Sequence, residues 1–223
     1  MSSISQTVAL VSKDVQSELR TRYALNALLM FVITSVATIL FALREDQVTP
    51  DILAGMFWVV VFFSAMSGLS RIFVSEEEKG TSLTLQLVAR PSVVYFGKLL
   101  FNCALTLVLT TAVTLLYVAV FPQFTVQSVD IFAATVVLGS LGFASAATII
   151  AAIIAKANTR GTLYPVLSFP ILIPLLMTVM KSTVRALADE PFTNALGELQ
   201  VLVSYVLVMT GGSFILFDYV WKD

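Results

Sequence analysis

Histidine is absent from this chain of 223 residues, and charged residues make up only 12% of it. Without imidazole there is no histidine general base, metal ligand or haem ligand. The single cysteine, Cys103, can form neither an internal disulfide nor a thiolate metal cluster. A soluble domain carries about 25% charged residues, so the composition excludes a soluble enzyme and a disordered chain. A net charge of −1 also offers no basic surface to nucleic acid.

Motifs of common catalytic sites are missing as well. The sequence has no GxxxxGK[ST] phosphate-binding loop, which excludes ATP binding by that route. The HExxH motif and every histidine-based triad require the residue that is absent. We therefore predict no catalytic residue, no metal site and no directly bound cofactor.

Hydrophobic residues, in contrast, account for 58% of the chain. A membrane-spanning helix needs about 20 mostly apolar residues, and six stretches qualify. They are Ala24–Leu43, Ile52–Val74, Leu99–Phe121, Ile131–Ala155, Leu163–Met180 and Leu199–Val220. Because these stretches fill most of the sequence, we predict one all-α membrane domain over residues 1–223, with six transmembrane helices and no separate soluble domain.

The placement of Lys and Arg gives the orientation, because cytoplasmic loops of membrane proteins are enriched in cations. Of the 13 basic residues, ten lie at the termini and in the loops after the second and fourth spans. Only Arg44, Lys181 and Arg185 lie on the other side. Both termini are therefore predicted to be cytoplasmic. The centres of the spans carry no charge, which argues against an ion-coupled pump, and Lys98 near a span end is expected to extend to the polar interface.

Residues 1–23 carry apolar side chains at helical spacing. They are Ile4, Val8, Val11, Val15 and Leu19. This single apolar face predicts an amphipathic helix that lies in the cytoplasmic interface of the membrane. The alternative is a helix that packs on another protein surface.

The segment 75–91, between the second and third spans, has the most informative pattern. Its landmarks are Glu76, Glu77, Glu78, Gly80, Thr81, Ser82, Leu83, Leu87, Val88 and Pro91. The acids extend the preceding helix out of the membrane, the glycine ends it, and the following hydroxyl residues can cap a new short helix. The proline permits the turn into the next span. The apolar stripe of the short helix can dock into a groove on a soluble partner or lie on lipid headgroups.

Prolines interrupt the fifth predicted span at Pro165, Pro170 and Pro174. Each removes a backbone donor, and in a membrane the freed carbonyls are tolerated only against protein or a cavity. We therefore expect a kinked helix that faces protein, either as a moving element or as a bent packing element.

Two further groups of residues in the spans have alternative readings. Small residues recur at Ser140, Ala144, Thr148 and Ala152, with a similar pair at Ser64 and Gly68. Small residues let membrane helices approach closely, here within the chain or at a dimer face. Aromatic residues gather at Phe57, Trp58, Phe62 and Phe63. These rings either line a lateral groove or face lipid and neighbouring helices.

The acidic run, the Gly-Thr-Ser turn, the leucines, Pro91 and then Lys98 resemble the coupling-helix segment of type-2 ABC exporter permeases. Within that superfamily the chain resembles the CcmB family, haem exporter protein B of cytochrome c maturation. The resemblance rests on the total length and on the stretch 156–176, where a basic-Gly loop precedes a proline-bearing apolar segment. One position departs from the pattern, since Thr84 stands where related loops often have an acid.

The resemblance implies a type-2 ABC exporter permease in the bacterial inner membrane, present in two copies. Each copy would seat the CcmA ATPase on the helix Ser82–Val88, with CcmC, CcmD and the haem chaperone CcmE as further partners. ATP hydrolysis on CcmA would then drive haem export or the release of haem-loaded CcmE, and partners would hold the haem. The region 181–198 would form a periplasmic loop with short helices. Alternatives are a permease for a lipid-linked glycan, drug or peptide, and a non-transporting scaffold.

Overall fold

The computed structural model describes residues 3–21, 23–43, 48–156 and 160–222, and these ranges contain helices but no strand. The helices are α1 (Ser3–Thr21), α2 (Tyr23–Ala42), α3 (Pro50–Leu69), α4 (Arg71–Glu78), α5 (Ser82–Val88), α6 (Pro91–Val120), α7 (Val129–Ala155), α8 (Arg160–Leu187) and α9 (Phe192–Lys222). The prediction of an all-α chain is confirmed for these residues.

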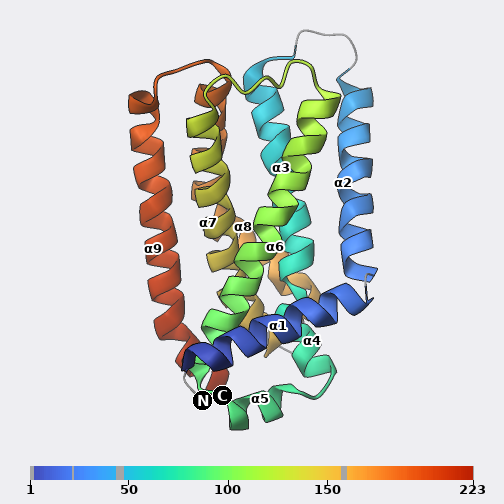
Figure 1. Cartoon of the computed structure of the whole chain (residues 1–223), viewed down its shortest axis with the longest axis vertical. Coiled ribbons are helices and arrows are strands. Elements are labelled where there is room, and N and C mark those ends of the chain that lie inside the picture. The colour runs from blue at the N-terminus through green and yellow to red at the C-terminus, as the bar shows by residue number, and fades with distance from the viewer. Residues whose placement is uncertain (1–2, 22, 44–47, 157–159, 223) are drawn as a thin grey trace.

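Six segments are long and apolar enough to cross a membrane, as predicted. They are α2, the α3–α4 pair, α6, α7, α8 and α9, and they run side by side along the long axis of the molecule (Figure 1). The chain is therefore a multi-pass membrane protein. Residues 181–198 are mostly the last turns of α8 and the first turns of α9, joined by the turn at 188–191. Polar residues continue both helices past the apolar runs, because the backbone hydrogen bonds of a helix do not depend on apolar side chains.

The spans pack around α7, which contacts α3, α4, α6, α8 and α9. Its small residues make this close packing possible: a Cβ at Gly139 would lie 2.8 Å from the Trp58 ring, and a Cβ at Gly142 would lie 2.7 Å from Leu175. The ridge of small residues is buried inside the chain at Ser140, Ala144, Thr148 and Ala152. Of the two readings of this ridge, the structure confirms packing within the chain.

The aromatic residues of α3 are mostly core residues. Phe57, Trp58 and Phe62 are buried, whereas Phe63 is exposed. The indole Nε1 of Trp58 donates a hydrogen bond of 2.8 Å to Thr183 Oγ1, which ties α3 to α8. Burial of the three rings against neighbouring helices favours a structural role over a ligand groove.

The prolines of α8 do not interrupt the helix, which runs from Arg160 to Leu187. The side chain of Pro165 lies outside the described part of the chain, and the rings of Pro170 and Pro174 are exposed on the surface of the bundle. Pro174 leaves the carbonyl of Pro170, four residues before it, without its helical donor. In the same turn of α8, the next carbonyl, Ile171 O, accepts a 2.9 Å hydrogen bond from the Tyr205 hydroxyl of α9, so α9 contacts the backbone of α8 just before Pro174.

Helix α1 lies across one end of the bundle, close to both termini and to α5 (Figure 1). Its predicted apolar face points away from the rest of the chain, since Ile4, Val8 and Leu19 are exposed. Its other face packs on α6, where the side chain of Leu10 fills the space above Gly97. The structure confirms packing on protein for one face of α1. The opposite face is exposed, and its place in the membrane interface stays a prediction.

Candidate functional site

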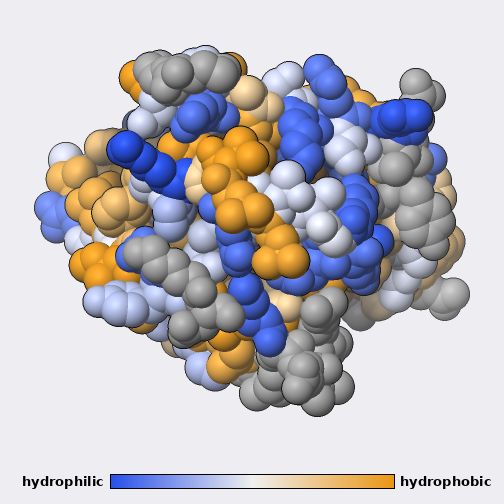
Figure 2. Space-filling view, turned by 90° about the horizontal axis from the view of Figure 1, so that it is seen from below, coloured by the Kyte–Doolittle hydropathy of each residue, from blue (hydrophilic) through white to orange (hydrophobic). Residues whose placement is uncertain are grey.

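Helix α5 projects beyond the end of the bundle (Figure 1). Its predicted apolar stripe is strongly exposed, with Leu83 70%, Leu87 89% and Val88 73% exposed. Seen from this end, a narrow hydrophobic ridge stands amid hydrophilic side chains (Figure 2). Such a ridge on a short, projecting helix is suited to insertion into a groove of another molecule.

The start of this site is a tight helix end between α4 and α5. Gly80 adopts a positive φ of 66°, which favours glycine. The amide of Gly80 donates to Glu77 O at 3.1 Å, and that of Thr81 donates to Glu76 O at 2.9 Å. This pair of bonds is the Schellman pattern, so Gly80 ends α4 as the sequence predicts.

The hydroxyl of Thr81 has a different partner from the one expected. Thr81 occupies the N-cap position of α5, but its side chain makes no capping bond. Its Oγ1 instead donates to Glu76 Oε2 at 2.5 Å. Ser82, the other candidate cap, is buried in the first turn of α5. The beginning of α5 is therefore fastened to α4 rather than capped by its own hydroxyl residues.

The middle of α5 is fastened to the last helix of the chain. Gln86 Nε2 donates a 2.8 Å hydrogen bond to the backbone carbonyl of Trp221. The indole of Trp221 stacks on Phe217, with ring centroids 5.5 Å apart, and packs against Phe73 of α4. Two spans, α3–α4 and α9, thus position the projecting helix.

A buried group of charges lies directly behind this site. Lys98 of α6 is only 1% exposed, and its Nζ lies 2.8 Å from Glu76 Oε1 and 3.0 Å from the Asp14 carboxylate. Lys13 Nζ reaches the same Glu76 oxygen at 2.7 Å from the solvent side. We refer to Asp14, Glu76 and Lys98 as the charged joint, because they connect α1, α4 and α6.

Burial dominates the electrostatics of the charged joint at Asp14. It raises the pKa of this carboxyl, because desolvation penalises the charged form, while the nearby Lys98 ammonium opposes the shift. Two acids share the one buried cation, with Lys13 as a second partner for Glu76. Removing the cation would therefore leave two carboxylates without their shared buried partner.

The structure separates the three acids that the sequence places together. Glu76 points inward and is buried, while Glu78 is exposed and Glu77 is half-buried. The expectation that Lys98 extends to the polar interface is wrong, because its side chain is enclosed by acids from two other helices. One signal could have indicated this joint: Asp14 follows Leu10 by four residues, which puts an acid and an apolar side chain on one helical face.

The arrangement suits mechanical coupling rather than catalysis. The described residues contain no group of three or more His, Cys, Asp or Glu that could hold a metal ion. Instead, an exposed apolar stripe lies on a short helix whose beginning is bonded to α4 and whose middle is bonded to α9, and α4 is ion-paired to α1 and α6. A force on α5 can therefore reach four other helices through direct contacts.

The sequence of this chain matches a known protein family. The sequence model described as CcmB protein matches residues 5–214, which include α2 to α8 in full and most of α1 and α9. No curated protein matches the chain. The chain therefore belongs to the CcmB family, the membrane permease subunits of the haem exporter for cytochrome c maturation, which is an ABC transporter system with a partner ATPase.

Proposed function

We propose that this permease docks the ATPase CcmA on the stripe formed by Leu83, Leu87 and Val88. The observation that carries the proposal is the combination of exposure and anchoring: these residues are the free face of a helix that α4 and α9 hold in place. A helix that only rested on lipid headgroups would need no such pair of anchors. Insertion of a short apolar ridge into a groove is a common mode of helix recognition.

The orientation follows from the same end of the molecule. Helix α5, the beginning of α1 and the end of α9 lie at one end of the molecule. By sequence position, ten of the 13 basic residues belong to the termini and loops of this side, and cytoplasmic segments of membrane proteins carry such an excess. We assign this end to the cytoplasm and the chain to the bacterial inner membrane. ATP and CcmA are then on the side where the stripe is exposed.

Coupling would work by population shift through a docked element. Closure of two CcmA subunits on ATP moves the α5 helices of two permease copies. The Thr81–Glu76 bond and the charged joint pass this movement to α1 and α6, and the Gln86–Trp221 bond passes it to α9. The work performed is haem export or the release of haem-loaded CcmE from a complex with CcmC and CcmD. Partners hold the haem, since this chain has no histidine for its iron.

Charging the stripe tests the docking. We expect Leu83→Asp combined with Leu87→Asp to abolish co-purification of CcmA, because two carboxylates would have to enter an apolar groove. The matched control is Thr84→Asp, an exposed polar position on the same short helix. Thermal unfolding of each variant confirms that the spans are intact. CcmA retained at the wild-type level by the double variant would refute the docking site.

The haem part of the proposal needs a separate measurement. The purified complex with CcmA, CcmC, CcmD and CcmE should release haem-loaded CcmE only when ATP is hydrolysed, and the stripe variant should block this release. A complex that couples ATP hydrolysis to a glycan, drug or peptide instead would show stimulated ATPase activity without CcmE in the preparation. A scaffold would show no stimulation of ATPase activity at all.

A further inference from the structure

A cavity of about 250 Å³ opens beside the charged joint, between α1 and the ends of three spans. Its lining places it beside α1, near the beginning of α2 and the junction of α3 and α4. Its lining comes from α1, α2, α3, α4 with its C-cap, and α6. Its polar residues include Asp14, Ser17, Glu18, Arg71, Glu78 and Lys79.

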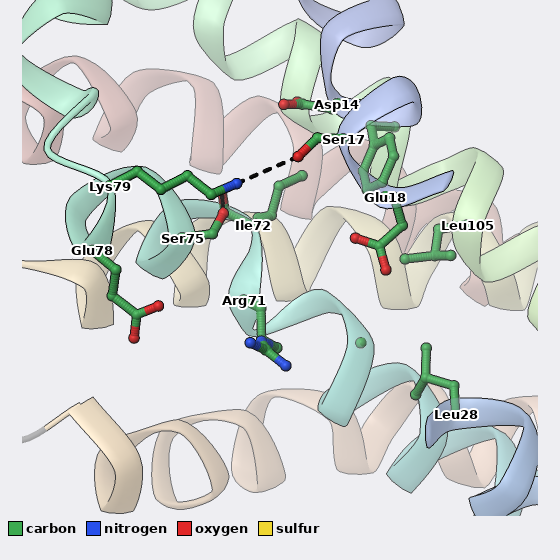
Figure 3. A pocket seen from close by; sticks show the side chains of 12 residues that line it. Asp14, Ser17, Glu18, Leu28, Arg71, Ile72, Ser75, Glu78, Lys79 and Leu105 are labelled. Atoms are coloured by element: carbon green, nitrogen blue, oxygen red, sulfur yellow. Dashed lines mark hydrogen bonds between the residues drawn. The ribbon is translucent and has the colours of Figure 1, made fainter. Parts of the chain in front are cut away.

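The lining of the cavity has an apolar part and a polar part. On α3–α4, Gly68, Arg71, Ser75 and Lys79 recur at steps of three and four, so they form one face of the helical segment that leaves the bilayer. Figure 3 shows Leu28 and Leu105 on one side of the cavity, with Glu18 next to Leu105, and Ser75, Glu78 and Lys79 on the other side. A ligand that fills the cavity therefore needs an apolar part directed toward the bilayer and a charged part directed toward the aqueous phase.

The cavity is lined by charged side chains of both signs, and some of them form no ion pair with a described residue. Arg71 makes no ion pair or hydrogen bond with any described residue. Lys79 donates only a 3.3 Å hydrogen bond to Ser17 Oγ, and Figure 3 shows Lys79, Arg71 and Glu78 around the same space. Asp14 is already engaged by Lys98. Two cations and at least one carboxylate, Glu78, are thus available to a ligand.

We propose that the cavity binds a zwitterionic phospholipid with a primary-amine headgroup, phosphatidylethanolamine, from the leaflet at the α5 end. Arg71 and Lys79 hold the phosphate, since charge-assisted hydrogen bonds to phosphate are among the strongest available to these side chains. Glu78 accepts hydrogen bonds from the ammonium group. One acyl chain lies against Leu28 and Leu105. This inference does not rest on the docking of CcmA.

The chemistry of the lining selects this headgroup over others. A quaternary ammonium has no N–H to donate to Glu78, and it is usually held by aromatic faces, whereas the one aromatic residue of the lining, Phe101, belongs to the apolar end. A lipid with a purely anionic headgroup would be repelled by the acids of the lining. The match to both cations and Glu78 requires a headgroup that carries both signs of charge.

The experiment uses the full chain, extracted from membranes in mild detergent and analysed by native mass spectrometry for bound lipid. We expect Arg71→Gln combined with Lys79→Gln to reduce bound phosphatidylethanolamine about tenfold, the size of effect that follows when a charge-assisted contact is lost. The matched control, Arg90→Gln with Lys181→Gln, removes two exposed cations outside the cavity and should leave the bound lipid unchanged. Equal retention in both double variants would overturn the proposal.

Two further variants separate the headgroup from the acyl chain. Leu105→Trp fills the apolar end without altering any charge and should also displace the lipid. Glu78→Gln removes the ammonium acceptor and should shift the preference from phosphatidylethanolamine toward phosphatidylglycerol in vesicles of equal composition. If the wild-type chain already retains phosphatidylglycerol in preference, or if neither variant changes the bound lipid, the assignment is wrong.

Discussion

The Nζ of Lys98 lies 2.8 Å from Glu76 Oε1, although the two residues belong to helices on either side of α5. The same ammonium lies 3.0 Å from the Asp14 carboxylate of α1. A single buried cation thereby connects the interfacial helix, the segment before α5 and the span after it. Because buried charges are costly without partners, we expect both ion pairs of Lys98 to persist as long as α1, α4 and α6 keep their positions.

Substitution of Lys98 tests the importance of this joint. We expect Lys98→Met to destabilise the chain by about 3–5 kcal/mol, the usual cost of leaving buried charges without their partner. The measurement is thermal or chemical unfolding of the purified chain in detergent. Lys181→Met is the control, because Lys181 is exposed and lies outside the cavity beside the joint, and we expect it to change the stability by less than about 0.5 kcal/mol.

A rescue experiment distinguishes lost ion pairing from lost packing. If the penalty comes from the two carboxylates, then adding Asp14→Asn and Glu76→Gln to Lys98→Met should restore a large part of the stability, since a neutral buried group costs less than an ion. If the triple variant is as unstable as Lys98→Met alone, the shape of the lysine side chain, and not its charge, is what matters here.

Gln86 provides a test of the second anchor of α5. We expect Gln86→Ala to leave the spans intact, because one hydrogen bond contributes about 0.5–1.5 kcal/mol. The loss of the 2.8 Å bond to Trp221 O should instead raise hydrogen exchange in residues 81–89 and weaken the stimulation of CcmA. Thr84→Ala, on the exposed side of the same helix, should change neither quantity. Unaltered exchange in Gln86→Ala would mean that α4 alone holds the helix.

The sequence predicts the local parts of this site and misses the long-range parts. Gly80, Leu83 and Leu87 are recognisable because a helix end and an apolar stripe depend on neighbouring residues only. Glu76 cannot be told from Glu77 and Glu78 in this way. What makes it different is Lys98, 22 residues away, and that lysine's second partner, Asp14, which lies 84 residues from Lys98.

In the fold, too, the sequence predicts the local features but not the long-range contacts. Six apolar runs predict six spans, because the bilayer sets the length of a spanning helix. The first turns of α6 hold apolar residues but end on Gly97 and Lys98, and those of α9 are interrupted by Thr193, Asn194 and Glu198, so no unbroken apolar run marks them. The bond from Gln86 to Trp221 joins residues 135 apart, and no periodicity in either segment indicates it. Packing, not local pattern, decides which polar side chains meet.

The close contact between α7 and α3 leads to a prediction about overpacking. We expect Gly139→Ala to destabilise the chain by about 1–3 kcal/mol, because the new Cβ would lie 2.8 Å from a Trp58 ring that its hydrogen bond to Thr183 holds in place. Gly211→Ala is the control, since no atom lies within 4 Å of a Cβ there, and alanine favours a helix over glycine. Unfolding measurements on both variants give the comparison; equal stability would mean that α3 and α7 can move apart at no cost.

The hydroxyl of Tyr205 should matter because of the proline that lies three residues after its acceptor. Its 2.9 Å bond to Ile171 O supports the carbonyl ladder of α8 near Pro174. We expect Tyr205→Phe to cost about 1 kcal/mol in the wild-type chain and clearly less in a Pro174→Ala background, where the N–H restored at position 174 can bond Pro170 O and the turn that contains Ile171 no longer depends on α9 for support. A double-mutant cycle on unfolding free energies measures the coupling, and Tyr219→Phe at an exposed position serves as the control. Additive effects would show that the tyrosine supports α8 independently of the proline.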